Sequence, residues 1–329
     1  MHTDTDMKGY VTLLNEMNGY IRWQLISSAI KHHVFDHIKE WTVAGTVAGK
    51  LGGRTDRTEI FLDALVSCGY LEKCCGRYRN SSLSARYLVS DSETYQGRLV
   101  LSLASRRLYG LDDIMSLIAA KDAAVFNLGN EPVWTEAFEN LIPFQKMVGL
   151  NAVETVVSLE GLNTDGRFLD LGGGPGFIGI SILDTFPSMS MTLFDLPSVI
   201  EMAQKIHGDR ISYISGSYSK DDIGSGYDLI WASRSLYYAD DLHALLCKIA
   251  GALNAGGYFI SVHEGLYNEK TQPQEVIINR LGVALSGSDV SIKIGEIEEA
   301  VAGSGLILVG SRISGDSGGE ADVIIARKP

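Results

Sequence analysis

The residues best suited to chemistry lie between Arg167 and Gly179, where the chain reads RFLDLGGGPGFIG. A short apolar run contains one acid, Asp170, and then breaks into glycines, which permit positive φ and leave room for a ligand against the main chain. Such a turn from strand to helix offers free amides at the carboxyl end of the strand, where open α/β sheets bind ligands. The stretch therefore predicts a nucleotide-type site rather than a plain turn.

Two ligand chemistries fit this loop. Gly174, Gly176 and Gly179 match the G-x-G-x-x-G fingerprint of dinucleotide sites, and Asp195 follows about twenty residues on, near the spacing of a ribose contact. The other pattern is an acid followed by alternating glycines, and it begins at Asp170. A carboxylate beside the loop repels a pyrophosphate but suits a ligand that carries an ammonium and a sulfonium. The acid favours the second ligand, while the fingerprint keeps a dinucleotide open.

The elements around the loop are predicted to form an α/β sheet. Apolar strands alternate with helical stretches, which is typical of a parallel sheet covered on both faces. The segment SGDSGGE between the last two strands is too short for a helical crossover, so these strands must form an antiparallel hairpin. The predicted strands are 167–171, 191–195, 211–215, 227–232, 258–263, 307–312 and 321–327.

Upstream of the sheet, the sequence predicts helices and a winged helix. Apolar residues recur at helical spacing over 11–39 and predict two amphipathic helices, broken near Gly19. The apolar surplus from Leu13 to Trp23 is expected to pack either on its own chain or on another subunit. Two further helices, 42–51 and 55–67, the latter capped by Asp56, precede a hairpin of strands at 69–73 and 77–79.

A winged helix can read DNA or serve in packing. Its second helix would carry Arg or Lys toward a DNA groove, but here it carries Asp56, Glu59 and Asp63 around an apolar face. The whole chain of 329 residues has a formal net charge of -12, which opposes nucleic acid and anionic membranes alike. We therefore expect packing, with no nucleic-acid partner.

The lack of targeting patterns and the use of cysteine predict a cytoplasmic protein. No apolar run approaches the ~18 residues of a membrane span, and the N-terminus lacks the pattern of a signal peptide. The four cysteines form no C-x-x-C pair and are expected to be reduced thiols. His33 and His37 could share a metal, but no third ligand is near in sequence, so no metal site is expected.

Residues 99–162 are predicted to be helical, with a break at 129–132. They carry an aromatic and methionine stripe of Trp134, Phe138, Phe144 and Met147. Such a stripe is either core between domains or the lid of an apolar substrate pocket. We assign Trp134 to the core and the other three to the pocket.

Taken together, the segments FLDLGGGPG, FDLPSVI, YDLIWASRSLYYADD and GGYFISVHE resemble the plant-type small-molecule O-methyltransferase family and its bacterial relatives. The resemblance implies a Rossmann-like methyltransferase fold with seven strands, the last antiparallel. It implies a winged-helix dimerisation domain (1–98), a helical linker and lid (99–162) and a domain that binds S-adenosyl-L-methionine, or SAM (163–329). It also implies a cytoplasmic homodimer of secondary metabolism that methylates oxygen or carbon of a small aromatic or polycyclic acceptor.

The resemblance also implies where SAM, released as S-adenosyl-L-homocysteine (SAH), is held. Asp170 and the glycines after it would line the methionine part, and Asp195 would hold the ribose hydroxyls. The adenine pair of the family is Asp-Met; here it is Ser217-Tyr218, of which Tyr218 can stack on the ring. The implied cofactor residues are Asp170, Gly172, Gly173, Gly174, Asp195, Leu196, Ser217, Tyr218, Ser233 and Arg234.

The chain departs from the family where a base would act. The catalytic His of oxygen-methylating members is Tyr237 here, and the two acids that steady it correspond to His263, with Glu264 beside it, and to Ser291. An imidazole titrates near neutral pH, so His263 is predicted to be the general base, with Tyr237 as its orienting partner or a contact to the acceptor. Alternatively no base is needed, because proximity alone can carry a methyl transfer.

Acceptor contacts are expected from Phe138, Phe144, Met147 and Tyr238. Two other functions stay open at this stage. One is a nicotinamide-dependent oxidoreductase, and the other is a winged-helix protein that binds SAM without methyl transfer.

Overall fold

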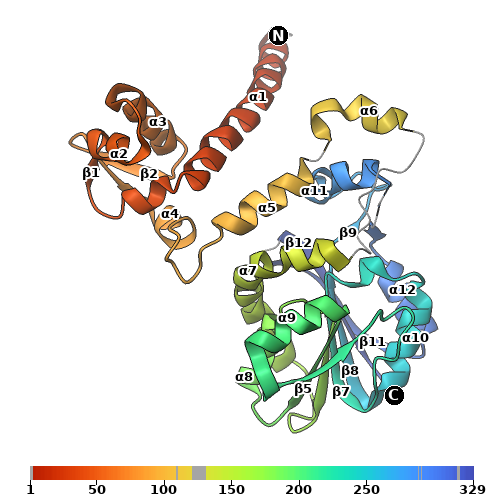
Figure 1. Ribbon diagram of the computed structural model, residues 1–329. Helices are drawn as coiled ribbons and strands as arrows, with labels where there is room; N and C mark the ends of the chain where they lie inside the picture. Colours follow the sequence, from red (N-terminus) through yellow and green to blue (C-terminus); the bar gives the residue numbers. More distant parts are fainter. Residues whose placement is uncertain (1–2, 109, 121–130, 288, 290, 317–318) are drawn as a thin grey trace. The chain divides into compact units, whose positions relative to one another are not determined.

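The computed structural model divides into two compact units, Met1–Leu101 and Ser102–Pro329 (Figure 1). It describes residues 3–108, 110–120, 131–287, 289, 291–316 and 319–329. The three-part division expected from the sequence, 1–98, 99–162 and 163–329, stays a prediction. No helix in the described ranges is long and apolar enough to span a membrane.

The first unit is a helical domain with a small sheet. Its strands are ordered β1-β3-β2, all antiparallel, and the β2–β3 turn uses positive φ at Cys75 (49°) and Gly76 (73°). Helix, turn, helix and hairpin follow in the expected order. The elements are α1 (Thr3–Lys31), η1 (Val34–His37), β1 (Thr42–Val43), α2 (Ala44–Leu51), α3 (Thr55–Ser67), β2 (Leu71–Cys74), β3 (Arg77–Asn80) and α4 (Ser82–Tyr87).

Two local predictions for this unit are wrong. The N-terminal helix runs unbroken through Gly19, because one glycine costs a helix only about 1 kcal/mol and the apolar spacing continues on both sides. Asp56 is not the cap of α3. That position belongs to Arg54, whose guanidinium donates to the Asp56 carboxylate at 2.8 Å.

The core of the first unit leaves part of α1 uncovered. Ile26, Ala29 and Ile30 at the C-terminal end of α1 are buried with Phe35 and Leu62. The preceding turns expose large apolar side chains, which we call the α1 apolar face. This face consists of Tyr10, Val11, Leu13, Leu14, Met17, Tyr20 and Ile21, which are between 45% and 68% exposed.

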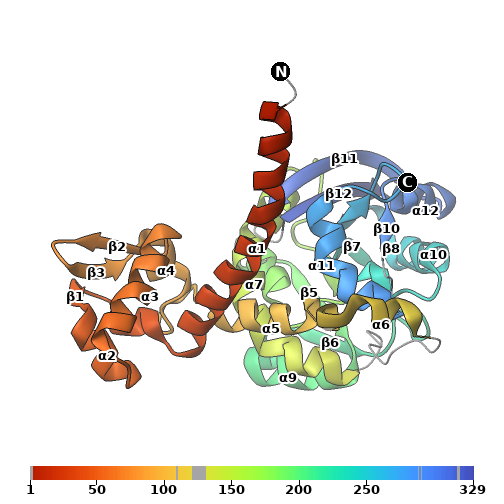
Figure 2. The same cartoon turned by 90° about the horizontal axis from the view of Figure 1, so that it is seen from above.

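The second unit is built on a seven-stranded sheet of order β11-β12-β8-β7-β4-β5-β6. Strands β4 to β8 pair in parallel, whereas β12 pairs antiparallel with both β8 and β11. Figure 2 shows β11 and β12 side by side along one edge of the sheet. The prediction of an antiparallel last strand is confirmed. The strands are β4 (Arg167–Leu171), β5 (Ser190–Asp195), β6 (Ser212–Ser215), β7 (Tyr227–Ser233), β8 (Leu253–His263), β11 (Ile307–Asp316) and β12 (Gly319–Arg327), with β9 (Gly265–Leu266) pairing separately with β10 (Ile292–Lys293).

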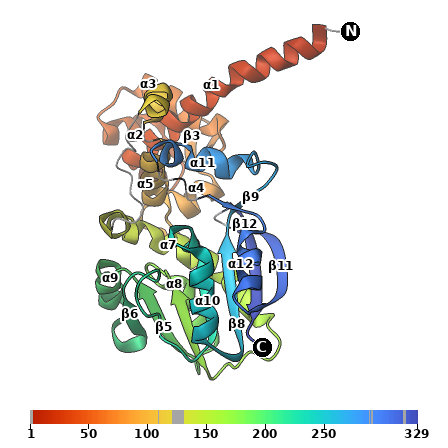
Figure 3. The same cartoon turned by 90° about the vertical axis from the view of Figure 1, so that its right-hand side faces the viewer.

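Helices cover both faces of this sheet, so its strands read as continuous apolar runs (Figure 3). Buried residues of α7, α8 and α9 form one core against the sheet, and those of α10 and α12 form another. The helices are α5 (Gly97–Arg107), which crosses the boundary of the units, η2 (Leu111–Asp113), α6 (Ile114–Ala119), α7 (Glu131–Val157), α8 (Phe177–Thr185), α9 (Pro197–His207), η3 (Gly208–Arg210), η4 (Leu236–Tyr238), α10 (Leu242–Ala252), α11 (Gln274–Leu285) and α12 (Glu296–Gly303).

Helix α7 is fixed closely to the helices beside it. A Cβ on Gly149 would lie 2.3 Å from Ser181 Oγ, so only glycine permits this approach of α7 to α8. At the other end, the Glu131 carboxylate accepts from the Ser198 amide and Thr135 Oγ1 lies 2.9 Å from Ser198 Oγ, which joins α7 to α9. Of the expected break at 129–132, residues 129 and 130 lie outside the described chain, while the other two open α7.

Candidate functional site

The glycine loop joins β4 to α8 at the carboxyl edge of the sheet. Gly172, Gly174 and Gly176 have φ of 68°, 56° and 77°, values that glycine adopts readily. Gly173 has no room for a side chain, because a Cβ there would lie 2.5 Å from the carboxyl group of Asp170. The loop therefore needs glycine for backbone conformation at three positions and for space at the fourth.

The sequence predicts free amides at this loop, but three of them are bonded within the chain. The amide of Gly174 donates to Asp195 Oδ2 at 2.7 Å, and that of Gly176 to the carbonyl of Gly173 at 3.0 Å. Phe177, the first residue of α8, donates to Gln145 Oε1 at 2.9 Å. The chain itself occupies these three donors, which a phosphate could otherwise use at a helix N-terminus.

Asp170 lies beneath the loop rather than at its surface. Its side chain is 2% exposed, and Oδ2 accepts from the Gly179 amide at 3.2 Å. Burial, with a contribution from the charge of Asp195, raises the pKa of Asp170 to about 7. An ionised carboxyl at this position therefore favours positive charge nearby.

Asp195 ends β5 beside the loop and is partly exposed. Its two oxygens accept from Gly174 and Leu196, each at 2.7 Å. Burial raises its pKa to about 6, and the charge of Glu131 adds to the shift. Two carboxyl groups, Asp170 and Asp195, thus lie against the loop, which is an environment for a cation rather than for a pyrophosphate.

Tyr218 and Ser235 lie beside the first glycine of the loop. The Tyr218 ring would come within 3.7 Å of a Cβ on Gly172, and its hydroxyl donates to the Ser235 carbonyl at 2.5 Å. Ser235 Oγ donates to the Leu171 carbonyl at 2.9 Å. Ser217 precedes this ring in a turn, where its amide donates to Asp221 at 2.8 Å.

At the tips of β7 and β8, Glu264 collects three donors. Arg234 Nε donates to Glu264 Oε1 at 2.7 Å, Arg280 Nη2 donates to Oε2 at 3.0 Å, and the Tyr237 hydroxyl also donates to Oε2. Burial alone would raise the pKa of Glu264, but Arg234, Tyr237 and Arg280 outweigh it and hold the pKa below the usual value. Arg234, which follows Ser233 at the end of β7, adopts a φ of 52°, a conformation uncommon outside glycine.

The predicted role of His263 as general base does not agree with its geometry. The ring is 1% exposed, its Nε2 accepts from the amides of Ser235 (3.0 Å) and Leu236 (2.9 Å), and its Nδ1 lies 2.7 Å from Ser261 Oγ. Burial lowers the pKa of His263 to about 3. A neutral imidazole with both nitrogens engaged holds the β7 tip in place and has no free lone pair for a substrate proton.

Tyr237 was expected to orient His263 or to contact the acceptor. Its ring packs edge-on against His263, with centroids 4.8 Å apart, but its hydroxyl bonds Glu264 instead, donating to the side chain and accepting from the amide at 2.7 Å. Burial, followed by the charge of Glu264, raises the pKa of Tyr237 well above its usual value. The hydroxyl is therefore neutral, and its proton and one of its acceptor sites are already bonded to Glu264.

The aromatic residues divide differently from the prediction. Phe138 is 2% exposed and belongs to the core, so its assignment to the pocket is wrong; the helical spacing that it shares with Phe144 does not reveal which face is covered. Phe144 is partly exposed. The guanidinium carbon of Arg234 lies over its ring, 5.5 Å from the ring centroid. Tyr238 packs edge-on against Trp134 at 5.1 Å, and Met147 is partly exposed.

Sequence reasoning missed Gln145 and Ser235. Both are buried polar residues whose bonds reach the loop or the strand that leads into it. A signal existed for Gln145, which is a polar residue between Phe144 and Met147 within an apolar stripe. Ser235 carried no signal, since a serine after a strand is an ordinary turn residue.

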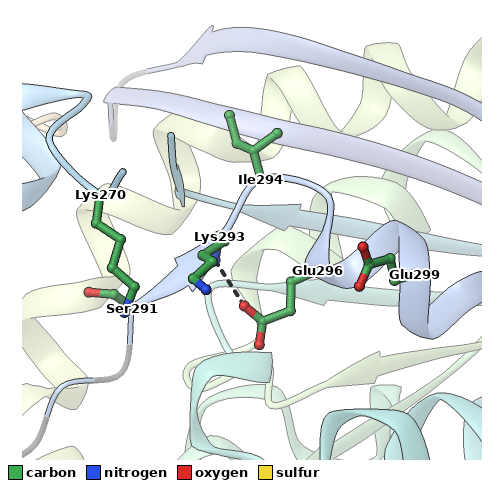
Figure 4. Close-up of a pocket in the computed structure, with 6 residues that line it drawn as sticks. All are labelled: Lys270, Ser291, Lys293, Ile294, Glu296 and Glu299. Atoms are coloured by element: carbon green, nitrogen blue, oxygen red, sulfur yellow. Dashed lines mark hydrogen bonds between the residues drawn. The ribbon is translucent and has the colours of Figure 1, made fainter. Parts of the chain in front are cut away.

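A separate hollow of about 570 Å³ lies beside β10 (Figure 4). Ser291, which stands where the resembling family has its second acid, lines this hollow with two lysines and two glutamates rather than joining the Tyr237 group. The described residues contain no cluster of three His, Cys, Asp or Glu that could hold a metal.

Comparison with known proteins places this geometry in context. A model of the O-methyltransferase domain matches residues 125–289, and a model of the O-methyltransferase dimerisation domain matches residues 14–90. The 3-hydroxy-5-methyl-1-naphthoate 3-O-methyltransferase of Streptomyces sahachiroi is 28% identical over 81% of each chain. The bacteriochlorophyllide d C-20 methyltransferase of Chlorobaculum tepidum is 26% identical over 78% of this chain and 79% of its own.

Among solved structures, human N-acetylserotonin methyltransferase in complex with SAM superposes with a TM-score of 0.77. It is 22% identical and the match covers 97% of both chains. At this identity the similarity establishes the fold, a Rossmann-like sheet with an N-terminal helical region.

The buried carboxyl of Asp170 predicts a stability that depends on pH. Its pKa is raised from 3.8 to about 7, so the folded state binds the proton more tightly and loses stability as pH rises through this range. Asp170→Asn removes the free-energy cost of ionising this buried carboxyl. At ~1.4 kcal/mol per pKa unit, the variant should be more stable than the parent at pH 8 by up to ~4 kcal/mol. Urea unfolding at pH 8 and pH 5 measures this, with the exposed Asp165→Asn as control. An advantage equal at both pH values would contradict the assignment.

His263 gives a second prediction. Because its folded pKa lies near 3, its ring should stay neutral between pH 8 and 5 in histidine NMR spectra, and stability should fall as pH drops below about 6.5. His263→Phe leaves two buried amides without an acceptor and should cost on the order of 1–3 kcal/mol of stability. His243→Gln, at an exposed position, is the control. A His263 signal that titrates near pH 6.5 would restore the base hypothesis.

Proposed function

The chain belongs to the O-methyltransferase family, and on that premise we propose that it transfers a methyl group from SAM to oxygen or carbon of a small aromatic or polycyclic acceptor. The observation that carries the proposal is the glycine loop with Asp170 and Asp195 against it, in which the amides of Gly174, Gly176 and Phe177 are already bonded within the chain. A ligand with positive charges and no phosphate complements this loop. A pyrophosphate would meet both repulsion and occupied donors, which disfavours the nicotinamide alternative.

The residues present fit SAM. Asp195 can accept from two ribose hydroxyls while it keeps its amide bonds, because a carboxylate has about four acceptor sites. Tyr218 offers a ring beside Gly172 for the adenine, and Gly174 leaves its main chain open, with no atom nearer than 3.4 Å to an added Cβ. We also propose contacts from Gly173, Leu196, Ser217, Ser233 and Arg234, and from Asp170 through its charge beneath the loop.

SAM supplies a methyl group on a positively charged sulfur that is already activated for displacement. The protein then needs to align the acceptor and, for a weak nucleophile, to remove a proton. His263 and Tyr237 are both neutral and hydrogen-bonded, so neither takes that proton. We therefore propose that alignment dominates and that the acceptor reaches its nucleophilic form unaided, as an acidic hydroxyl or an electron-rich carbon can.

The acceptor is proposed to lie against Phe144, Met147 and Tyr238, near the Arg234–Glu264 pair. These residues come from α7 and from the tip of β7, and they bring aromatic surface to the edge of the sheet where the loop lies. The relatives named for methyl transfer to oxygen and to carbon both match along most of this chain, so either atom stays within the proposal.

We also propose a cytoplasmic homodimer that acts in secondary metabolism. The match to a dimerisation domain over residues 14–90 and the exposed α1 apolar face support self-association. The four cysteines, all free, are consistent with a reducing compartment. The proposed division keeps 1–98 for dimerisation, 99–162 as linker and lid, and 163–329 for SAM binding.

The cofactor assignment predicts the result of a titration. SAH should bind the purified protein and NAD should not, and Asp195→Ala should weaken SAH binding by on the order of 1–3 kcal/mol because two ribose hydroxyls lose their acceptor. Isothermal calorimetry measures both ligands, with Asp165→Asn as the matched control. SAH affinity unchanged in Asp195→Ala, or tight NAD binding, would argue against the site. Mass spectrometry of protein incubated with SAM and cell extracts then identifies the acceptor and separates an enzyme from a SAM-binding regulator.

The dimer proposal predicts the effect of a truncation. Removing residues 1–24 deletes the α1 apolar face and should yield monomers or aggregates, since that face no longer holds two copies together. Sedimentation velocity of the parent and the truncated protein measures the subunit number. A milder variant, Met17→Ser with Tyr20→Ser, controls for loss of the helix. A truncated protein with the subunit number of a dimeric parent would refute this interface.

A further inference from the structure

Gln145 makes two bonds to the glycine loop from a different helix. Its Nε2 donates to the carbonyl of Gly173 at 2.8 Å, and its Oε1 accepts from the amide of Phe177 at 2.9 Å. The side chain is 8% exposed. One amide group therefore spans the loop from its second glycine to the first residue of α8.

The bonds of Gln145 take the place of the side-chain cap that a residue next to the start of α8 would ordinarily provide. Helix α8 has no side-chain cap of its own, because Gly176 occupies the cap position, so Gln145 supplies the missing acceptor. The peptide between Gly173 and Gly174 is held on both sides: its carbonyl accepts from Gln145, and its N–H donates to Asp195. A glycine peptide would otherwise rotate easily, so this double attachment selects one orientation.

Helix α7, which carries Gln145, also carries the proposed acceptor residues. Phe144 precedes Gln145, and Met147 follows two positions later. The helix is fixed at Glu131 to α9 and at Gly149 to α8. A shift of α7 that accommodates an acceptor would therefore act directly on the loop through Gln145.

We propose that Gln145 is a positioning residue that joins the acceptor helix to the SAM loop and sets the orientation of the Gly173–Gly174 peptide. The inference rests on the proposed function for the identity of the ligand, but the attachment itself is a property of the chain. Gln145 acts through the loop, not on the reacting atoms. Loss of its amide should weaken cofactor binding and release the start of α8 together.

A glutamate at this position imitates the Gln145 amide only while its carboxyl group is protonated. A protonated carboxyl has one donor and one acceptor, as Gln145 does, whereas an ionised carboxylate offers two acceptors and faces the Gly173 carbonyl with negative charge. Burial raises the pKa of such a carboxyl, so the change falls in an accessible range. The other charged or titratable groups facing the site are Asp170 from β4, Asp195 from β5, Lys146 over the Phe177 ring, and His207 of α9, whose Nε2 lies 2.8 Å from the Pro175 carbonyl.

The experiment compares Gln145→Glu, Gln145→Leu and the parent at pH 5.5 and pH 8. SAH affinity is measured by calorimetry, and each variant is expressed relative to the parent at the same pH, which removes the titration of Asp170 and Asp195. Gln145→Leu should lose about tenfold at both pH values, and Gln145→Glu should lose about tenfold only at pH 8. Glu139→Leu, at an exposed position on the same helix, should bind as the parent does.

Hydrogen exchange of residues 172–177 gives a second readout that needs no ligand. Exchange should accelerate in Gln145→Leu at both pH values and in Gln145→Glu only at pH 8. A parent that fails to bind SAH overturns the proposed function, while the exchange pattern still decides the role of Gln145. Parent-like exchange and affinity in Gln145→Leu, or a Gln145→Glu protein indifferent to pH, would overturn the inference.

Discussion

The structure of the site depends on two carboxyl groups that lie where burial makes their ionisation unfavourable. Asp170 is buried under a loop in which Gly173 leaves no room for a side chain, and Asp195 lies beside the loop with both oxygens bonded to amides. Both pKa values are raised, to about 7 and about 6, because burial makes it unfavourable to ionise these groups without a cation nearby. A positively charged ligand relieves that cost, so folding and ligand preference are linked by the same two groups.

At the tips of β7 and β8, by contrast, the charge of a buried carboxylate is compensated by cations of the chain itself. There Glu264 is paired by Arg234 and Arg280 and bonded by Tyr237, so its charge is compensated within the chain. Where the resembling family has a catalytic histidine, this chain has a tyrosine whose hydroxyl is bonded to Glu264. On that resemblance, a group that transfers protons is replaced by one that is held within the chain.

The sequence was sufficient for the fold and for placing the glycine loop at the carboxyl edge of the sheet. Alternating apolar strands, the glycine loop and the short final hairpin specify the sheet, because each depends on local patterns or on chain length. Prediction from the sequence failed where contacts between residues far apart in the chain determine the role of a side chain. The spacing of Phe138 fits both core and pocket, and a strand-end histidine such as His263 looks like a base until two amides are seen to bond it. Gln145 bonds residues about thirty positions away, a separation that no local pattern encodes.

Because the His263 ring and the Tyr237 hydroxyl are both hydrogen-bonded within the chain, the proposed mechanism gives the loop attachment more weight. When a base contributes to the rate, some misalignment can be tolerated, because part of the barrier is lowered by proton transfer. Where alignment supplies nearly all of the acceleration, a displacement on the order of 1 Å can cost ~10²-fold. In the proposed function, the two bonds of Gln145, which join helix α7 to the glycine loop, then affect the rate even though they touch neither reacting atom.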